Sequence, residues 1–305
     1  MDPNQVSASA MISAFVRAHH ATHDDPKIFD DFLALSLFSP EQRVQFESNL
    51  SQALQFFDPQ RAAQCTDPSS ALAAFTRVQS GPIVLSRARY TEDALSAWLG
   101  AGERQYVILG AGLDTFVFRR PDLLPGLRVF EVDLPGTQNY KRQRQAELGW
   151  AEPPQASYLP VDFMHQNAAE VLLAAGFNRQ ALTFFSWLGV TYYLSRDVVF
   201  ETLRSLAAIA PAGSVIVFDY LDTQAFIPEK TAERVKRMQA ATQMAGEPMT
   251  SGFEPETLGA DLDPLGLRLT ENLGPADLQA RYFASRTDGF HAFEHIHFAW
   301  VEVKS

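Results

Sequence analysis

The chain has 305 residues, of which 46% are hydrophobic and 20% charged, a composition typical of a folded globular protein rather than a disordered chain. Its formal net charge of −11, with no basic stripe in the sequence, argues against binding to nucleic acid or to an anionic membrane surface. No signal-peptide pattern and no run of about 18 apolar residues occur, so we expect a cytosolic protein, and the single cysteine, Cys65, excludes an internal disulfide.

The first third of the chain, residues 1–105, is predicted to form an N-terminal helical cap. Apolar residues such as Ile12 and Phe15 recur there at helical spacing. The stretch DDPKIFDDFLALSLF, residues 24–38, has the pattern of a second amphipathic helix, and one or two further helices are expected in residues 71–99.

From residue 106 the pattern changes to short apolar strands separated by helix-length segments. Strands that are apolar on both faces indicate a parallel sheet covered by helices on both sides, so the predicted fold of residues 106–305 is a doubly wound α/β sheet. Two later segments, 265–274 and 295–304, complete a seven-stranded sheet, and the second is expected to end it as an antiparallel strand. Residues 222–258 are helical at first and then rich in Gly, Pro and Met, as in a cover over a pocket. The five apolar strands are YVILG, LRVFEVD, ASYLPVD, ALTFFSWLG and GSVIVFDYL.

A glycine turn, Gly110-Ala111-Gly112, follows the first predicted strand. In an open parallel sheet the ligand crevice lies outside the carboxyl ends of the strands, and the first strand-to-helix turn is its usual floor. Glycine permits a positive φ and a close approach of a ligand to the backbone. The G-x-G pattern alone is equally compatible with a turn of purely structural role.

Acidic residues at the ends of the next two strands point to an adenosine-containing ligand. Asp133 ends the second strand about twenty residues after the turn, where a carboxylate accepts hydrogen bonds from the hydroxyls of a ribose. Glu131 points to the same face of that strand and is the reserve candidate for this role. Asp162 and Phe163 follow the third strand, where the carboxylate can meet the adenine amino group and the ring can pack on the base.

The position of the third glycine of a dinucleotide fingerprint is occupied by Thr115. A dinucleotide needs the following helix N-terminus free for its pyrophosphate, but Asp114 stands at this helix entrance and would repel it. S-adenosylmethionine carries no phosphate and bears a sulfonium cation, which an acidic rim stabilises. Asp114 also suits the helix N-cap, and the two roles are compatible.

These segments resemble the leucine carboxyl methyltransferase family of class I S-adenosylmethionine-dependent methyltransferases, which includes bacterial O-methyltransferases of secondary metabolism. The resemblance covers roughly residues 10–220 and implies the Rossmann-like fold of class I methyltransferases, with S-adenosylmethionine as the cofactor. It is carried, in family order, by SRARYTEDAL, YVILGAGLDTFVFRRP, VFEVDLPGTQNYKRQR, YLPVDF and FFSWLGVTYYL.

The resemblance also implies roles for individual residues. Arg87, in SRARY, would pair with the methionyl carboxylate of the cofactor, and Arg17 is the candidate for a second basic residue from the N-terminal helix. The other implied contacts are those of Gly110 to Gly112 with the cofactor, of Asp133 with its ribose, and of Asp162 and Phe163 with its adenine.

The end of the fourth strand departs from the family pattern. Many relatives carry a Glu there, whereas this chain has Leu188. An acidic cofactor contact is therefore in doubt at this position, and Tyr192 and Tyr193 are the candidate polar groups facing the transferred methyl.

Histidines in HAFEHIHFAW offer a second set of chemical groups. A metal site of His291, Glu294, His295 and His297 is conceivable, and so is a general base, but exposed histidines at the end of a sheet explain the pattern as well. The sequence therefore predicts no metal.

The sequence predicts an S-adenosylmethionine-dependent O-methyltransferase that acts on a carboxylate or hydroxyl of a small molecule, or on a terminal carboxylate. Methyl transfer is an in-line displacement, so the protein has mainly to align and desolvate the reactants. Two alternatives from other classes remain open: an NAD(P)-dependent oxidoreductase of Rossmann type, and a non-catalytic protein that binds the cofactor.

Overall fold

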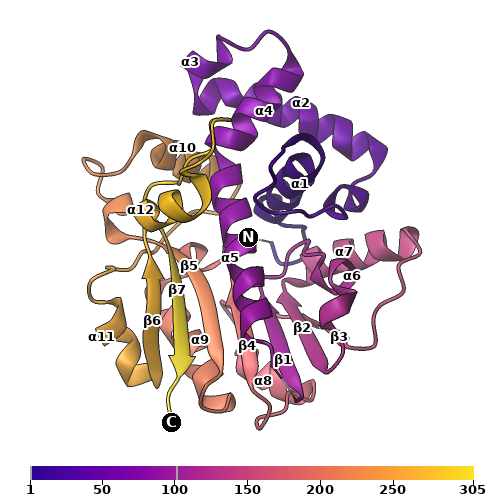
Figure 1. The fold of residues 1–305 in the computed structure, drawn as a ribbon, viewed down its shortest axis with the longest axis vertical. Coiled ribbons are helices and arrows are strands. Elements are labelled where there is room, and N and C mark those ends of the chain that lie inside the picture. Colours follow the sequence, from indigo (N-terminus) through magenta and orange to yellow (C-terminus); the bar gives the residue numbers. More distant parts are fainter. Residues whose placement is uncertain (1, 101) are drawn as a thin grey trace.

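The computed structural model describes residues 2–100 and 102–305, which form one seven-stranded sheet with helices on both faces (Figure 1). The strand order is β3-β2-β1-β4-β5-β7-β6, which confirms the predicted doubly wound α/β class. The strands are β1 Arg104–Leu109, β2 Leu127–Asp133, β3 Ala156–Pro160, β4 Thr183–Trp187, β5 Val215–Leu221, β6 Leu267–Leu273 and β7 Ile296–Val303.

Strands β1 to β5 pair in parallel, and β7 pairs antiparallel with both β5 and β6. The prediction that the last strand ends the sheet is wrong. Strand β7 lies between β5 and β6, and β6 forms the edge (Figure 1). The reason is burial on both faces. Consecutive residues Phe298 and Ala299 of β7 are both buried, whereas in β6 only Leu267 is buried and the other residues are exposed or partly exposed, as suits an edge strand.

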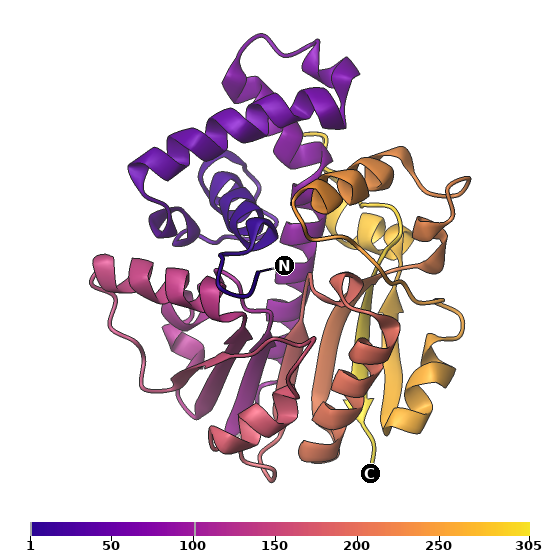
Figure 2. The same ribbon diagram turned by 180° about the vertical axis from the view of Figure 1, so that it is seen from behind.

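Helices cover the sheet on both sides and extend beyond one end of it (Figures 1 and 2). The shorter helical turns are η1 Ala34–Leu37, η2 Pro121–Leu123, η3 Thr191–Tyr193, η4 Thr223–Phe226, η5 Asp263–Leu265 and the π-helical η6 Gln279–Phe283. The α-helices are α1 Ala8–His23, α2 Pro40–Phe57, α3 Pro59–Ala62, α4 Pro68–Val78, α5 Ser80–Trp98, α6 Phe116–Arg119, α7 Pro135–Glu147, α8 Ala168–Ala174, α9 Arg196–Ile209, α10 Glu233–Met244, α11 Leu258–Leu262 and α12 Pro275–Leu278.

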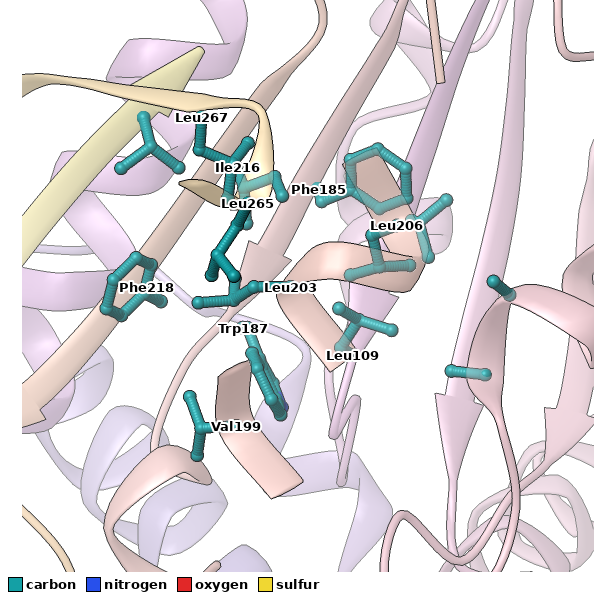
Figure 3. Packing of buried hydrophobic residues seen from close by; sticks show 14 of the residues in the cluster. Leu109, Phe185, Trp187, Val199, Leu203, Leu206, Ile216, Phe218, Leu265 and Leu267 are labelled. Carbon is teal, nitrogen blue, oxygen red and sulfur yellow. The ribbon is translucent and has the colours of Figure 1, made fainter. Parts of the chain in front are cut away.

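The two faces of the sheet bury different hydrophobic clusters, as the alternation of side chains along a strand requires. On one face, Leu203 and Leu206 of α9 lie over Phe185, Ile216 and Phe218 of β4 and β5 (Figure 3). On the opposite face the long helix α5 packs across the sheet against β1 and β4. The central strands are therefore apolar on both sides, and their carboxyl ends are held rigidly.

The N-terminal helices begin at strong capping residues. The Ser39 side chain accepts a hydrogen bond from the Gln42 N–H in a capping box at the start of α2, and Asp67 does the same for Ser70 at the start of α4. Proline occupies the first turn of both helices, where its missing N–H costs nothing. These helices share a third hydrophobic cluster, beyond the carboxyl ends of the parallel strands (Figure 2).

The prediction of a second amphipathic helix in residues 24–38 is wrong, because only η1 is helical there. Pro26 disfavours a continuous helix. The buried carboxylates of this segment are also used by distant residues: Asp24 accepts from Arg77, and Asp31 accepts from Arg17. Local periodicity is therefore overridden by tertiary hydrogen bonds.

Within residues 2–100 and 102–305, no helix has both the length and the apolar character that crossing a membrane requires.

Candidate functional site

A cavity of about 630 Å³ lies where β1, β2 and β4 end. Its floor is the glycine turn, and its walls come from α1, α5, α10 and residues 245–249. This is the place at which an open parallel sheet binds ligands. The cavity lining includes the residues that the sequence analysis assigns to the cofactor and the transferred methyl, from Arg87 and the turn to Tyr193, but not the reserve candidate Glu131.

The turn Gly110-Ala111-Gly112 has a backbone that only glycine adopts without strain. Gly110 and Gly112 have φ angles of +69° and +52°. A Cβ on Gly110 would lie 2.2 Å from a methyl carbon of Val190, and one on Gly112 would lie 3.2 Å from the Cβ of Ala10. The turn is therefore closely enclosed by the fourth strand-to-helix loop and by α1.

Asp133 joins the end of β2 to this turn. Its Oδ2 accepts from the Gly112 N–H at 2.5 Å, and its Oδ1 accepts from the Leu134 N–H at 2.6 Å. Burial raises the pKa of Asp133 to about 6, although these two N–H donors oppose the shift. A carboxylate oxygen accepts more than one hydrogen bond, so Asp133 keeps acceptor capacity toward the cavity that it lines.

Glu131, the reserve candidate, is engaged elsewhere. Its carboxylate is fully buried and pairs with the ammonium of Lys141 on α7. Burial raises the pKa of Glu131, and Lys141 opposes that shift. Because the pair is sealed between the sheet and α7, Asp133 is the β2 carboxylate at the cavity.

Asp162 and Phe163 lie just after β3, at the mouth of the cavity. The Asp162 carboxylate accepts from the Met164 N–H at 2.9 Å and contacts the His165 ring at 2.8 Å. The Phe163 ring lies 5.6 Å from that of Trp187, the last residue of β4. This loop therefore contributes one polar and one aromatic side chain to the lining of the cavity.

Arg87 is held by an acid that the sequence analysis missed. Its Nη1 donates to Asp219 Oδ2 at 3.2 Å and to the hydroxyl of Tyr192 at 3.1 Å. The second oxygen of Asp219 accepts from the Gly189 N–H at 2.5 Å. Asp219 is fully buried in β5, and the signal in the sequence was a lone acid inside the apolar run VIVFDYL.

The first turn of α1 contacts both Tyr193 and residue 247 of the cover. The Tyr193 hydroxyl lies 3.2 Å from Ser9 Oγ. Glu247 accepts from the Ser7 hydroxyl at 3.0 Å and from the Ala8 N–H at 3.1 Å, so its charge stabilises the positive end of the helix. Nothing in the Gly- and Pro-rich sequence around Glu247 indicates this contact.

The candidate second basic residue, Arg17, also lines the cavity but is paired. Its Nε donates to Asp31 at 2.8 Å, and its Nη2 donates to the Leu113 carbonyl just after the glycine turn at 2.8 Å. Thr115 donates to the other oxygen of Asp31 at 2.5 Å. Asp114 accepts from the Phe116 N–H at 2.6 Å, but the expected N-cap role is wrong, because the N-cap of α6 is Thr115 and Asp114 lies one residue before it.

The histidines at the start of β7 contact a carboxylate rather than the cavity. His295 Nδ1 lies 2.9 Å from Asp222, its Nε2 accepts from the Ala232 N–H, and His297 Nε2 lies 3.4 Å from the same carboxylate. In the described part of the chain, no group of three or more His, Cys, Asp or Glu residues is arranged to hold a metal ion. Both nitrogens of His295 are therefore occupied by structural contacts.

Comparisons of the sequence with protein-family models and with known proteins indicate the same family. The family model described as leucine carboxyl methyltransferase matches residues 10–207. The chain is 39% identical over 299 residues to YktD of Bacillus subtilis (strain 168), covering 98% of both chains, and YktD is named among the S-adenosyl-L-methionine-dependent methyltransferases. A relative from Mycobacterium avium (strain 104) with the same designation is 30% identical over 76% of this chain and 70% of its own.

Solved structures share the fold. A DUF574 family protein from Streptomyces avermitilis MA-4680 aligns with a TM-score of 0.56 and 15% identity, over 100% of this chain and 99% of its own. A protein from Thermobifida fusca YX described as a methyltransferase aligns with a TM-score of 0.51 and 15% identity, over 100% and 97%. The family and its relatives favour methyl transfer over the oxidoreductase and non-catalytic alternatives.

The close contacts around Gly110 predict that a side chain at this position destabilises the protein. Gly110→Ala should lower the free energy of unfolding by about 2–4 kcal/mol, because it adds both a positive-φ strain and a collision with Val190. Gly149→Ala is the matched control: Gly149 has a φ of +70° and open space around its Cβ position, so only the strain of about 1 kcal/mol is expected. Urea denaturation measures both.

Adding Val190→Ala to Gly110→Ala should recover part of the loss by relieving the collision while leaving the strain. A Gly110→Ala protein that is no less stable than Gly149→Ala would contradict the geometry described for the turn.

Proposed function

The chain belongs to the leucine carboxyl methyltransferase family and is an S-adenosylmethionine-dependent methyltransferase, and from that premise we propose that it methylates an oxygen atom. The acceptor oxygen belongs to a carboxylate or hydroxyl of a small molecule, or to a terminal carboxylate. The observation that carries this proposal is that a single cavity joins the glycine turn and Asp133 to the hydroxyls of Ser9, Tyr192 and Tyr193. Hydroxyls both donate and accept hydrogen bonds, so they can orient an acceptor oxygen.

The residues present fit a phosphate-free cationic cofactor. Gly110 and Gly112 line the cavity with backbone alone, so a ligand can approach the turn closely. Asp114, Asp133 and Asp162 give this end of the cavity an acidic rim, which suits a sulfonium and disfavours a pyrophosphate. In our proposal Asp133 binds the ribose, while Asp162 and Phe163 hold the adenine.

Arg87 is the proposed partner of the methionyl carboxylate. Its guanidinium is buried, and Asp219 holds it against the Gly189 loop. A buried arginine that is already paired keeps donors for a second carboxylate, because the guanidinium carries five N–H groups. Asp219 is then a positioning residue: it touches Arg87 rather than the ligand.

When bound, S-adenosylmethionine supplies an electrophilic methyl group on a positively charged sulfur. The chain's own residues have to align the acceptor oxygen and exclude water. In our proposal Tyr192 and Tyr193 face the acceptor. Burial raises the pKa of Tyr193 to about 12 and the pKa of Tyr192 well above its ordinary value, so both hydroxyls remain protonated. They therefore act as hydrogen-bonding groups rather than as bases at neutral pH.

The role of Asp133 can be tested through the binding of S-adenosylhomocysteine. Asp133→Asn should raise its dissociation constant roughly 10- to 100-fold, because hydrogen bonds from the ribose to a charged acceptor are lost. Ionised Asp133 accepts those bonds, and its pKa of about 6 in the free protein predicts that affinity falls as the pH drops below 6. Isothermal titration calorimetry between pH 5 and 8 measures both effects.

Asp122→Asn, which changes an exposed surface carboxylate, is the control and should leave affinity and pH dependence as in the unchanged protein. If Asp133→Asn binds S-adenosylhomocysteine with unchanged affinity, Asp133 does not hold the ribose.

The acceptor atom can be identified with S-adenosylmethionine that carries a trideuterated methyl group. The protein is incubated with this compound and a small-molecule extract of the organism that encodes it, and labelled products are found by mass spectrometry. Mild alkali releases labelled methanol from methyl esters and leaves methyl ethers intact, so it separates the two oxygen classes. A label found only on nitrogen, sulfur or carbon would contradict O-methylation.

A further inference from the structure

The cavity does not end at the glycine turn but continues into the helical cap. There it is lined by apolar residues from four helices, and we call this part the acceptor chamber. It is lined by residues of the N-terminal helices and of α10, and Figure 2 shows these helices beyond the carboxyl ends of the parallel strands. Its lining comprises Leu50, Ala53 and Phe57 of α2, Phe75 of α4, Val84 of α5 and Met238 of α10.

The chamber is part of the packed cap rather than a surface groove. The rings of Phe57 and Phe75 meet edge to face with centroids 5.4 Å apart, and Phe75 and Leu50 are buried. Arg237 of α10 donates to the Phe57 carbonyl, which ties α10 to the end of α2. Apolar side chains that face a cavity inside such a framework offer van der Waals contact and desolvation to an apolar ligand.

Each arginine that lines the cavity has its charge balanced by a carboxylate of the protein. Arg17 pairs with Asp31 at 2.8 Å and Arg119 pairs with Glu92 at 2.5 Å. Arg87 pairs with Asp219, and in our proposal it also takes the cofactor carboxylate.

The remaining charge of the lining is acidic. Glu247 at the cover and Asp133 at the turn both face the same cavity, and the lining that the structure describes contains no lysine. A carboxylate acceptor would therefore lose its hydration among apolar side chains inside a lining with more acidic than basic groups, which is unfavourable. A neutral acceptor avoids that cost.

We propose that the acceptor is a neutral molecule with a largely apolar body, which lies in the acceptor chamber and presents a hydroxyl group for methylation. This inference rests on the proposed O-methylation and selects the hydroxyl over the carboxylate. Gln79 and Ser80, at the start of α5, supply the polar groups at the helical end of the cavity and suit a second polar substituent on the acceptor. Met238 adapts to irregular shapes, so the chamber accommodates related molecules.

The acceptor oxygen forms a bond to the methyl carbon, the bond from that carbon to sulfur breaks, and its electron pair stays on sulfur. The hydroxyl proton is released to solvent, so one proton appears for each S-adenosylhomocysteine formed. Methylation of a carboxylate, which is already ionised, releases none.

Matched probes test the inference: 4-ethyl-, 4-butyl- and 4-hexylphenol against the 4-alkylbenzoates of the same chain lengths. Binding to the protein loaded with S-adenosylhomocysteine is measured by calorimetry, and turnover by S-adenosylhomocysteine formation and proton release. We expect the phenols to bind at least tenfold more tightly than the benzoates, with affinity increasing along the alkyl series, and one proton to be released per turnover.

Ala53→Phe fills the chamber and should raise the dissociation constant of 4-hexylphenol at least tenfold without changing that of S-adenosylhomocysteine. Ala208→Phe, the same change at an exposed position of α9, is the matched control and should have no effect.

The inference would be overturned by benzoates that bind or react better than the phenols, by no phenol binding to the loaded protein, or by unchanged phenol affinity in Ala53→Phe. Methyl esters as the products would overturn it while leaving O-methylation intact, whereas methylation only at other elements would overturn the proposed function itself.

Discussion

The hydrogen bond from the Gly112 N–H to the Asp133 carboxylate is the contact on which the site depends. It fixes the turn after β1 to the end of β2, so that the closely approachable backbone and the carboxylate face one cavity. The Gly110 and Ala111 N–H groups both bond the Val132 carbonyl, which adds a second attachment to the same strand. The turn is thus fixed by hydrogen bonds to the neighbouring strand β2, and a ligand binding there finds a preorganised surface.

The helical cap is held over this turn by charged contacts rather than by apolar packing alone. Arg17 links α1 to the Leu113 carbonyl and to Asp31, and Glu247 of the cover holds the first turn of α1. These contacts enclose the cavity between segments that are far apart in the sequence. The same enclosure desolvates whatever binds there, which strengthens electrostatic interactions with the acidic rim. The fold therefore combines a fixed cofactor floor with a cap of separate helices that shapes the space for the acceptor.

Much of the core could be predicted from the sequence, because strand periodicity and the glycine turn are local signals. Residues at strand ends, such as Asp133, were placed at the cavity because parallel strands end at one edge. Asp219 and Glu247 could not be found, since their roles arise from partners 132 and about 240 residues away along the chain. The segment around Pro26 and the position of β7 were misjudged because tertiary hydrogen bonds and burial on two faces decided them. Local sequence patterns thus locate the glycine turn and the acids at the strand ends better than the residues that enclose the cavity from other parts of the chain.

A crystal structure of the protein with S-adenosylhomocysteine bound would test most directly whether the glycine turn and Asp133 hold the cofactor. We expect S-adenosylhomocysteine to lie on the Gly110 to Gly112 turn, with both ribose hydroxyls within hydrogen-bond distance of the Asp133 carboxylate. A ligand seated elsewhere, or a ribose held by other residues while Asp133 contacts only Gly112 and Leu134, would contradict it.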